Sequence, residues 1–250
     1  MTAALETIGL IMRFGGITAT DDVSFTLERG ARHALIGPNG AGKTTFVNLL
    51  TGVLTPSAGT VLLGGEDITA LNREARVKRG IARTFQINQL FGAMTPLEMI
   101  ALVVSERLGE GGRPLARLDA SPRLVEETAD ILARFRLDDI MDERISTLPY
   151  GKQRQIEIAA AFAARPSVLL LDEPAAGVPE AERRELMATV AGLPEDVSVL
   201  LIEHDMDLVF RFATRITVLV NGRLLADGTP AEIANDPAVR AAYLGEHGYG

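Results

Sequence analysis

The stretch Gly37-Pro38-Asn39-Gly40-Ala41-Gly42-Lys43-Thr44 fits the pattern G-x-x-x-x-G-K-[ST]. Loops with this pattern surround the phosphates of a nucleotide with backbone N–H groups. The three glycines let the backbone take positive φ and come close to an anion. A helix that begins near Lys43 directs its free N–H groups and its positive dipole end at the same phosphates.

The segments on either side of this loop support the match. Arg32–Ile36 is a short apolar run typical of a strand, and Thr45–Leu50 is typical of a helix. Lys43 supplies a mobile positive charge for the outer phosphates, and the Thr44 hydroxyl is placed to bind Mg²⁺. The alternative, a glycine-rich turn that binds nothing, does not explain these flanks. We therefore predict a nucleotide site formed by residues 37–45.

The composition excludes several classes of protein. The 250 residues contain no cysteine, which excludes disulfides and thiolate metal sites. A formal net charge of -8 gives no basic surface of the kind that binds nucleic acid. The sequence has no signal-peptide pattern at its start and no apolar run near the roughly 18 residues of a membrane helix. These missing patterns lead us to expect a cytosolic chain, and the 47% of hydrophobic residues is enough for a substantial core.

The first part of the chain is predicted to form strands. Val23, Phe25 and Leu27 alternate with polar residues, as in a half-buried strand. Gly64-Gly65 separates two short runs and predicts a hairpin. The charged stretch at 73–80 is predicted to be an exposed helix whose charges face solvent. Phe14 stands in an Arg-Phe-Gly-Gly turn, where the simplest interpretation is a core aromatic.

The later part alternates between helices and buried strands. Helices are predicted at 97–108, from Ser121-Pro122 onward, at 155–165 and at 230–244, and strands at 168–171 and 199–202. Asn221-Gly222 predicts a hairpin. The predicted fold class is α/β: a P-loop NTPase (RecA-like) core with an N-terminal antiparallel β subdomain and an inserted helical subdomain. We expect one domain, with its core at 1–86 and 155–226, the helical insertion at 87–154 and a helical extension at 227–250.

Two acids follow the buried strand at 168–171. Asp172 stands at the carboxyl end of that strand, where ligands bind in open α/β sheets. In a protein with a phosphate loop, such an Asp normally holds the Mg²⁺ of a bound triphosphate. Glu173 beside it can polarise an attacking water. The alternative for both is a cap at a helix N-terminus.

The ordered set of motifs resembles the ATP-binding cassette ATPases of ABC transporters, from Phe14 to Leu244. The set comprises the phosphate loop, Gln86, a Leu-x-x-Gly signature near Gly151, the acid pair and His204. The resemblance implies that Phe14 stacks on adenine and that Gln86 touches the Mg²⁺ or the attacking water. It further implies that Glu173 is the catalytic base and that His204 contacts the γ-phosphate. A histidine after a strand is otherwise more often structural.

Several short segments of the sequence are similar to one of the two ATPase subunits of branched-chain amino acid importers, a group that includes urea and amide transporters. The matching segments are Arg83–Gln86, Leu90-Phe91 with Met94-Thr95, Ala175–Gly177 and Asp227–Pro230 with Tyr243–Gly245. The resemblance implies ATP and Mg²⁺ as ligands and a location on the cytoplasmic face of the inner membrane. Its implied partners are a second cassette (identical or related), integral membrane permeases and, indirectly, a solute-binding protein that selects the cargo.

The signature departs from the family pattern, which is commonly Leu-Ser-Gly-Gly-Gln with Tyr at the third position in this group. This chain has Leu148-Pro149-Tyr150-Gly151-Lys152. The serine hydroxyl that would bind the partner's γ-phosphate is therefore missing, and Lys152 replaces glutamine. Gly151 and the start of the following helix still present N–H groups, and Pro149 is compatible with a helix that begins there.

Two other functions share some of these motifs. A soluble cassette ATPase that acts on a cytosolic assembly has the same nucleotide motifs. Only the short segments shared with the importer subgroup argue against it. A regulatory module that senses ATP without turnover is opposed by the presence of both Glu173 and His204. The sequence thus predicts an ATPase subunit in which two cassettes enclose two ATP molecules head to tail.

Overall fold

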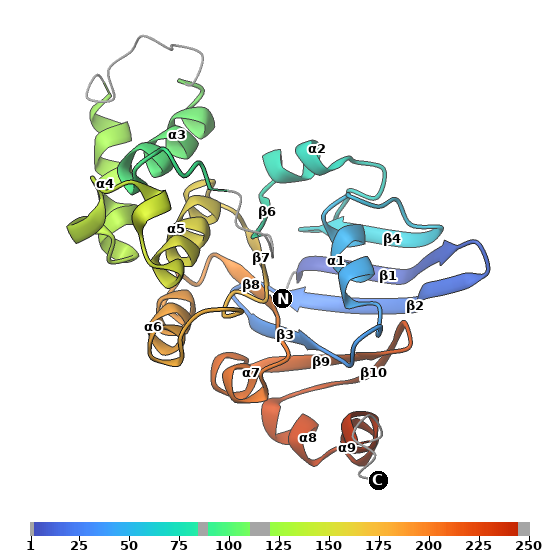
Figure 1. Cartoon of the computed structure of the whole chain (residues 1–250). Coiled ribbons are helices and arrows are strands. Elements are labelled where there is room, and N and C mark those ends of the chain that lie inside the picture. The colour runs from blue at the N-terminus through green and yellow to red at the C-terminus, as the bar shows by residue number, and fades with distance from the viewer. Residues whose placement is uncertain (1–2, 85–89, 111–120, 245–250) are drawn as a thin grey trace. The chain divides into compact units, whose positions relative to one another are not determined.

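The structure, a computed structural model, describes residues 3–84, 90–110 and 121–244. The chain divides into two compact units (Figure 1). The first comprises Met1–Arg83, Ser167–Glu173 and Pro194–Gly250, and the second comprises Thr84–Pro166 and Pro174–Leu193. The second unit includes residues 174–193, which the sequence analysis placed in the nucleotide-binding core. The predicted boundaries at 86, 154 and 226 concern functional subdomains and stay a prediction.

A six-stranded sheet carries the predicted site in the first unit. Its order is β10-β9-β3-β8-β7-β6, with parallel pairing from β9 to β6 and antiparallel pairing between β10 and β9. The buried runs at 32–36, 168–171 and 199–202 form strands as predicted, because they are covered on both faces. The strands are β3 (Arg32–Ile36), β6 (Ile81–Arg83), β7 (Val168–Asp172), β8 (Ser198–Ile202), β9 (Arg215–Val220) and β10 (Arg223–Gly228).

A second, antiparallel sheet confirms the predicted N-terminal β subdomain. Its order is β2-β1-β4-β5, and one face of β2 buries the alternating residues Val23, Phe25 and Leu27. The Gly64-Gly65 hairpin is also present, with Leu63 paired to Glu66. The strands are β1 (Ala3–Phe14), β2 (Ile17–Glu28), β4 (Ala58–Leu63) and β5 (Glu66–Asp67).

Helix α1 (Lys43–Leu50) is fixed in the main hydrophobic core of the first unit. Phe46, Val47, Leu49 and Leu50 are fully buried, in one cluster with residues of both sheets. The ring of Phe46 meets that of Phe25 edge to face, with centroids 5.6 Å apart. A helix packed in this way holds its own first turn, and the loop before it, in a constant position.

Arg76 corrects the expectation that all charges at 73–80 face solvent. The stretch is helical, as α2 (Arg73–Lys78), but Arg76 is only 1% exposed. Its guanidinium donates to the carbonyls of Leu49 and Leu50 at the end of α1, at 2.6 and 2.8 Å, and to those of Thr69 and Leu71. Burial lowers the pKa of Arg76, and nearby Asp67 opposes that shift. Arg76 therefore caps the negative end of the phosphate-loop helix.

Replacing Arg76 with methionine is expected to lower the free energy of unfolding by about 3 kcal/mol or more, because buried carbonyls lose charged donors. The measurement is urea unfolding of the purified chain. Arg79→Met is the matched control, since Arg79 is 40% exposed and, within the described part of the chain, forms its ion pair with Glu66 at the surface. Equal losses from both variants would contradict the capping role.

The last part of the first unit follows the prediction in outline. The hairpin of β9 and β10 forms at Asn221-Gly222 as expected, with Val220 paired to Arg223. The predicted helical segment at 230–244 is confirmed, and it consists of two helices, α8 (Pro230–Asn235) and α9 (Pro237–Leu244). Pro237 forces the preceding Asp236 out of helical geometry, to ψ 119°. Helix α7 (Met206–Phe212), which follows the predicted His204, was not predicted.

A network of polar side chains around the buried His33 joins β3, β9 and β10. His33 is fully buried, and its Nε2 lies 2.8 Å from Oγ1 of Thr217, which donates to Asp227. Arg215 also pairs with Asp227. Burial alone would raise the pKa of Asp227, but the hydrogen bonds from His33, Thr217 and Arg215 outweigh it, so the pKa is lowered.

This group predicts a pH dependence. Because the folded pKa of Asp227 lies below its ordinary value of about 3.9, its ionised form stabilises the fold at neutral pH. That contribution is lost as pH falls from the unfolded pKa through the folded one. The difference in unfolding free energy between the wild type and Asp227→Asn should therefore be constant near neutrality and shrink below about pH 4. A difference that stays constant down to pH 3 in urea titrations would contradict this.

The second unit is helical, as predicted for the inserted subdomain. Thr95 and Ser121 cap its first two long helices through side-chain bonds to N–H groups. Its third helix begins at Tyr150 and not at Gln155 as predicted, and α6 was not predicted. The elements are α3 (Pro96–Leu108), α4 (Pro122–Arg134), η2 (Asp138–Ile140), η3 (Ile145–Thr147), α5 (Tyr150–Ala163) and α6 (Glu180–Ala191).

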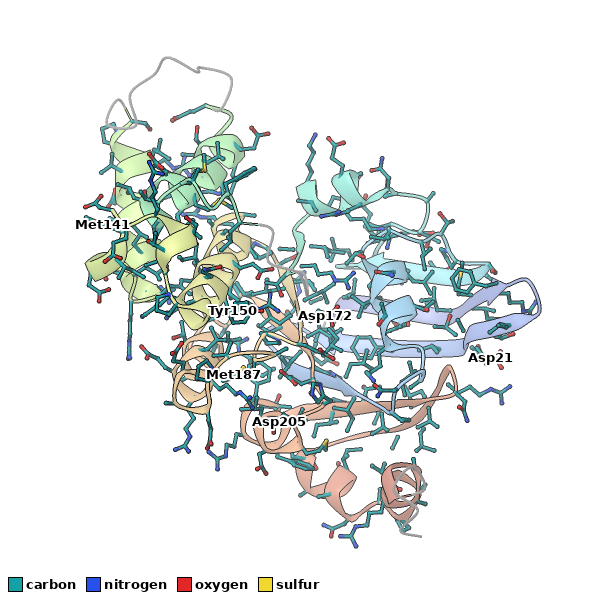
Figure 2. The ribbon with its side chains drawn as sticks, viewed as in Figure 1. Asp21, Met141, Tyr150, Asp172, Met187 and Asp205 are labelled. Atoms are coloured by element: carbon teal, nitrogen blue, oxygen red, sulfur yellow. The ribbon has the colours of Figure 1, made fainter. Side chains whose placement is uncertain are left out.

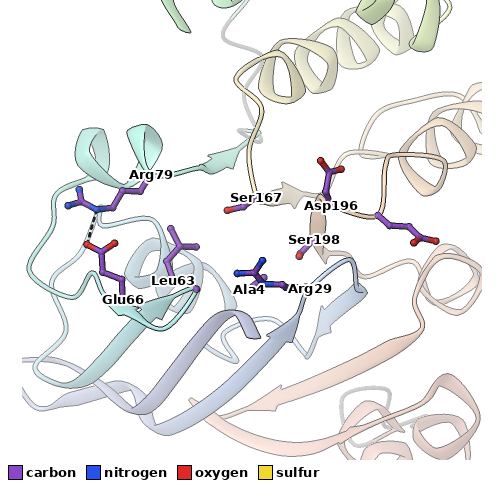
Figure 3. Close-up of a pocket in the computed structure, with 10 residues that line it drawn as sticks. Ala4, Arg29, Leu63, Glu66, Arg79, Ser167, Asp196 and Ser198 are labelled. Carbon is purple, nitrogen blue, oxygen red and sulfur yellow. Dashed lines mark hydrogen bonds and ion pairs between the residues drawn. The ribbon is translucent and has the colours of Figure 1, made fainter. Parts of the chain in front are cut away.

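Figure 3 shows a pocket of about 400 Å³ in the first unit. Ser167 and Ser198 line it where β7 and β8 begin, together with Arg29 and the Arg79–Glu66 pair. The phosphate loop follows the other, carboxyl end of β3, and none of its residues lines this pocket. The pocket is therefore separate from the predicted nucleotide site.

Candidate nucleotide-binding site

The glycines of the phosphate loop have the backbone geometry that the sequence predicts. Gly37, Gly40 and Gly42 have φ of 155°, 76° and 97°. A Cβ on Gly37 would lie 2.1 Å from the carbonyl oxygen of Leu219, and one on Gly42 would lie 2.3 Å from that of Ala19. At these two positions a side chain is excluded by neighbouring backbone, so the loop requires glycine to keep its shape.

Lys43 and Thr44 stand in the first turn of α1. The Lys43 ammonium donates to the carbonyls of Gly37 and Pro38, the latter at 2.9 Å, so it lies over the loop itself. Helix α1 has no acidic residue in its first turn, and its cap residue Gly42 has no side chain. Its free N–H groups and dipole therefore remain unopposed by a carboxylate of their own helix, which favours an anion there.

The acid pair stands at the carboxyl end of β7, the second strand from β3 in the sheet, and Figure 2 labels Asp172. Asp172 is the last residue of that strand, and its Oδ2 lies 2.6 Å from Nη2 of Arg83 on β6. The side chain of Asp172 is only 13% exposed. The alternative of a helix cap does not apply, because α6 begins only at Glu180 and its cap residue is Pro179.

Glu173 has an unusual backbone conformation. Its φ is 46°, a left-handed value that costs a residue with a side chain about 1–2 kcal/mol. Its N–H donates to the carbonyl of Ile202 at 2.9 Å, which ties it to the end of β8. Oε1 of Glu173 lies 3.4 Å from Nδ1 of His204, the second residue after β8. Strain of this kind is concentrated at functional sites. Here the strained residue is a predicted catalytic residue, and its side chain lies beside a second one.

His204 is held by its neighbours in sequence. Its backbone N–H donates to Oε2 of the buried Glu203 at 3.0 Å. Asp205 then caps α7 by accepting from the N–H groups of Asp207 and Leu208. The imidazole itself is 68% exposed, so it is accessible to a ligand.

Phe14 ends β1 at the turn to β2, where it pairs with Ile17. Its side chain is 46% exposed. The interpretation as a core aromatic is therefore wrong. An exposed ring is compatible with stacking on a nucleobase, the role that the family resemblance implies.

The signature residues lie in the second unit. Pro149 occupies the N-cap of α5 without a side-chain cap, and the carbonyl of Leu148 accepts from Gln153 at 2.9 Å. A Cβ on Gly151 would lie 1.8 Å from Oε2 of Glu182, so glycine permits a close approach to α6. The Lys152 ammonium donates to Oε1 of Gln155 at 3.2 Å and to the carbonyl of Arg136 at 3.5 Å.

Comparison with known proteins bears on this site directly. The family model described as ABC transporter matches residues 20–176, more than half of the chain. The chain belongs to the ABC transporter family. A second model, described as branched-chain amino acid ATP-binding cassette transporter, matches residues 223–249.

The cassette is similar over its whole length to proteins of that family. The high-affinity branched-chain amino acid transport ATP-binding protein BraF of Pseudomonas aeruginosa is 41% identical, over 97% of this chain and 98% of its own. LivG of Escherichia coli, of the same description, is also 41% identical over the same shares. A crystal structure of an ABC transporter cassette in its ADP conformation gives a TM-score of 0.85 at 30% identity, covering 98% of this chain and all of that one. The P-loop fold class is thereby confirmed.

The residues of the cassette fit a magnesium nucleotide. Mg²⁺ prefers oxygen ligands and is usually held by one or two protein groups together with substrate phosphates. Asp172 provides a carboxylate, and the Thr44 hydroxyl makes no hydrogen bond to another described residue. In the described ranges no group of three or more acidic, histidine or cysteine side chains is placed to hold a metal alone. A metal shared with phosphates agrees with this donor set.

One predicted site residue and two unpredicted ones complete the description. Gln86 lies outside the described residues. The sequence analysis missed two residues. Arg83 contacts Asp172 directly, and Asn48 contacts Arg83. Arg83 stands within a quoted family segment, but no motif assigned it a partner, and its partners are 35 and 89 residues away in sequence.

Proposed function

We propose that this chain is the ATP-hydrolysing subunit of an importer for branched-chain amino acids or related small polar solutes. The observation that carries this is the 41% identity to BraF and LivG over nearly the whole of each chain. The match of residues 223–249 to the branched-chain amino acid transporter model supports the same assignment from a segment outside the nucleotide motifs.

In the proposed mechanism the first unit binds and orients ATP. Backbone N–H groups of the phosphate loop and the Lys43 ammonium bind the phosphates, and Phe14 stacks on adenine. Thr44 and Asp172, with Gln86, hold the metal, which when bound neutralises charge on the β- and γ-phosphates. Glu173 takes the proton of the attacking water and His204 contacts the γ-phosphate; both roles suit the 3.4 Å contact between their side chains.

The proposed assembly places two cassettes head to tail. The signature of each, Leu148–Lys152, then faces the nucleotide held by the phosphate loop of the other. The described residues contain no helix that is both long and apolar enough to span a bilayer. We infer that separate permease subunits cross the inner membrane, that the cassettes bind to their cytoplasmic face, and that a solute-binding protein delivers the cargo.

Pro149 predicts unequal sites in such a dimer. A hydrogen bond to a charged phosphate contributes about 1.5–3 kcal/mol, and proline has no hydroxyl to make it. The site completed by this signature is therefore expected to be about ten- to a hundredfold slower than one completed by a serine signature. Pro149→Ser should raise its turnover in the assembled transporter. Phosphate release should be measured for Pro149→Ser with Lys152 present and with Lys152→Gln. If Pro149→Ser leaves the rate unchanged in both backgrounds, the asymmetry is contradicted.

The assignment is tested by isolating the tagged chain from membranes of its own source organism. Co-purification with two permeases, together with loss of labelled leucine uptake in cells that carry only Glu173→Gln, is expected. Uptake should be competed by isoleucine and valine. Recovery without any membrane protein would instead favour a soluble cassette ATPase that acts on a cytosolic assembly.

A further inference from the structure

Arg83, the last residue of β6, joins two parts of the cassette that no sequence motif connects. Its Nη2 lies 2.6 Å from Oδ2 of Asp172, and its Nη1 lies 2.7 Å from Oδ1 of Asn48. The side chains of Arg83 and Asp172 are only 11% and 13% exposed. One guanidinium therefore connects the carboxylate at the end of β7 to helix α1.

The position of Asn48 gives this bridge its meaning. Asn48 lies four residues after Thr44 on α1, so both side chains belong to one face of the helix. Helix α1 is held at its other end by Arg76 and along its length by the core. The Arg83 bridge thus links Asp172 to the helix face that carries Thr44. Thr44 and Asp172 are the two groups that fit a shared metal.

We propose that Arg83 is a positioning residue that fixes the Asp172 carboxylate relative to Thr44 in the geometry that a magnesium nucleotide requires. The inference rests on the proposed function, because it concerns the same nucleotide site. Mg²⁺ demands nearly ideal octahedral geometry with ligands at about 2.0–2.1 Å. Two ligands on different elements meet that demand only if something holds the elements in register.

The chemistry of arginine suits this task. Its planar fork donates to two partners in fixed directions, whereas an ammonium is a point charge that cannot hold both. A mostly buried ion pair contributes little net stability, since desolvation offsets the attraction. Groups that orient metal-binding carboxylates typically affect metal affinity by about 10- to 100-fold when they are removed. Orientation therefore explains the bridge better than stability does.

The test measures the dissociation constant of a fluorescent ATP analogue for the full chain in Mg²⁺ and in EDTA. The EDTA constant divided by the Mg²⁺ constant isolates the metal-dependent part of binding. Arg83→Lys should lower this ratio by about tenfold or more, with the EDTA constant unchanged because residues 37–45 are intact. Asn48→Ala cuts one arm of the bridge and should lower the ratio by a smaller factor. In an Asp172→Asn background Arg83→Lys should cause no further loss.

Arg79→Lys is the matched control, because Arg79 precedes the same strand and, among the described residues, its ion pair is with Glu66 at the surface. Its ratio should equal that of the wild type. A wild-type ratio in both Arg83→Lys and Asn48→Ala, with lower thermal midpoints, would overturn the proposal and leave the bridge a purely structural contact. A wild-type chain that binds no ATP analogue at all would contradict the proposed function, and the inference with it.

Discussion

Glu173→Gln is expected to retain ATP binding while turnover falls by roughly 10²-fold or more. The substitution keeps the size of the side chain and removes the base that takes the proton of the attacking water. Because ATP remains bound, the variant should accumulate as a closed dimer. Phosphate release in the assembled transporter measures the first effect, and an ATP-dependent shift in size-exclusion chromatography measures the second.

Glu195→Gln provides the control for this experiment, since Glu195 is an exposed glutamate in the same unit, on the pocket of Figure 3. It should hydrolyse ATP at the wild-type rate. Normal turnover in Glu173→Gln would remove Glu173 from the role of base. The strained φ of 46° at this position would then need another explanation.

Lys43→Ala should weaken ATP binding by about tenfold to more than a hundredfold. The estimate follows from the loss of a charged hydrogen bond worth about 1.5–3 kcal/mol, at 1.4 kcal/mol per tenfold. Hydrolysis should fall as well, because the same ammonium neutralises the outer phosphates. Equilibrium titration with a fluorescent ATP analogue measures the loss.

Lys78→Ala is the appropriate comparison for Lys43→Ala. Lys78 ends α2, is 73% exposed and pairs with Glu74 in the same helix. It should bind the analogue as the wild type does. Wild-type affinity in Lys43→Ala would show that the ammonium, which lies over the carbonyls of Gly37 and Pro38, does not move to the phosphates.

The local features of the fold were predictable from the sequence because short-range patterns determine them. Alternation in β2, the apolar runs of β3, β7 and β8 and the two glycine-containing hairpins all appear where the patterns place them. The break between α8 and α9 was also readable, since Pro237 disfavours helix at the residue before it. Helix α6 was missed because its sequence, EAERRELMATVA, is mostly charged in its first half and buries only three residues.

The unpredicted parts of the site depend on contacts between distant segments. Arg76 stands in a charged helix that resembles a solvated one, and only the end of α1, 26 and 27 residues earlier, explains its burial. Arg83 meets Asp172 because β6 and β7 are neighbours in the sheet, a pairing that a single sequence does not reveal. Phe14 stands at the exposed end of β1, and the sequence around it does not distinguish an exposed aromatic from a buried one.

The central claim, that this cassette hydrolyses ATP to power amino acid import, is tested most directly by phosphate release from the transporter in proteoliposomes. The chain is assembled there with its own permeases, and leucine-loaded solute-binding protein is added on the outer side. We predict that the loaded protein stimulates phosphate release and that Glu173→Gln abolishes the stimulation. Phosphate release that is identical with and without the loaded protein would contradict the account.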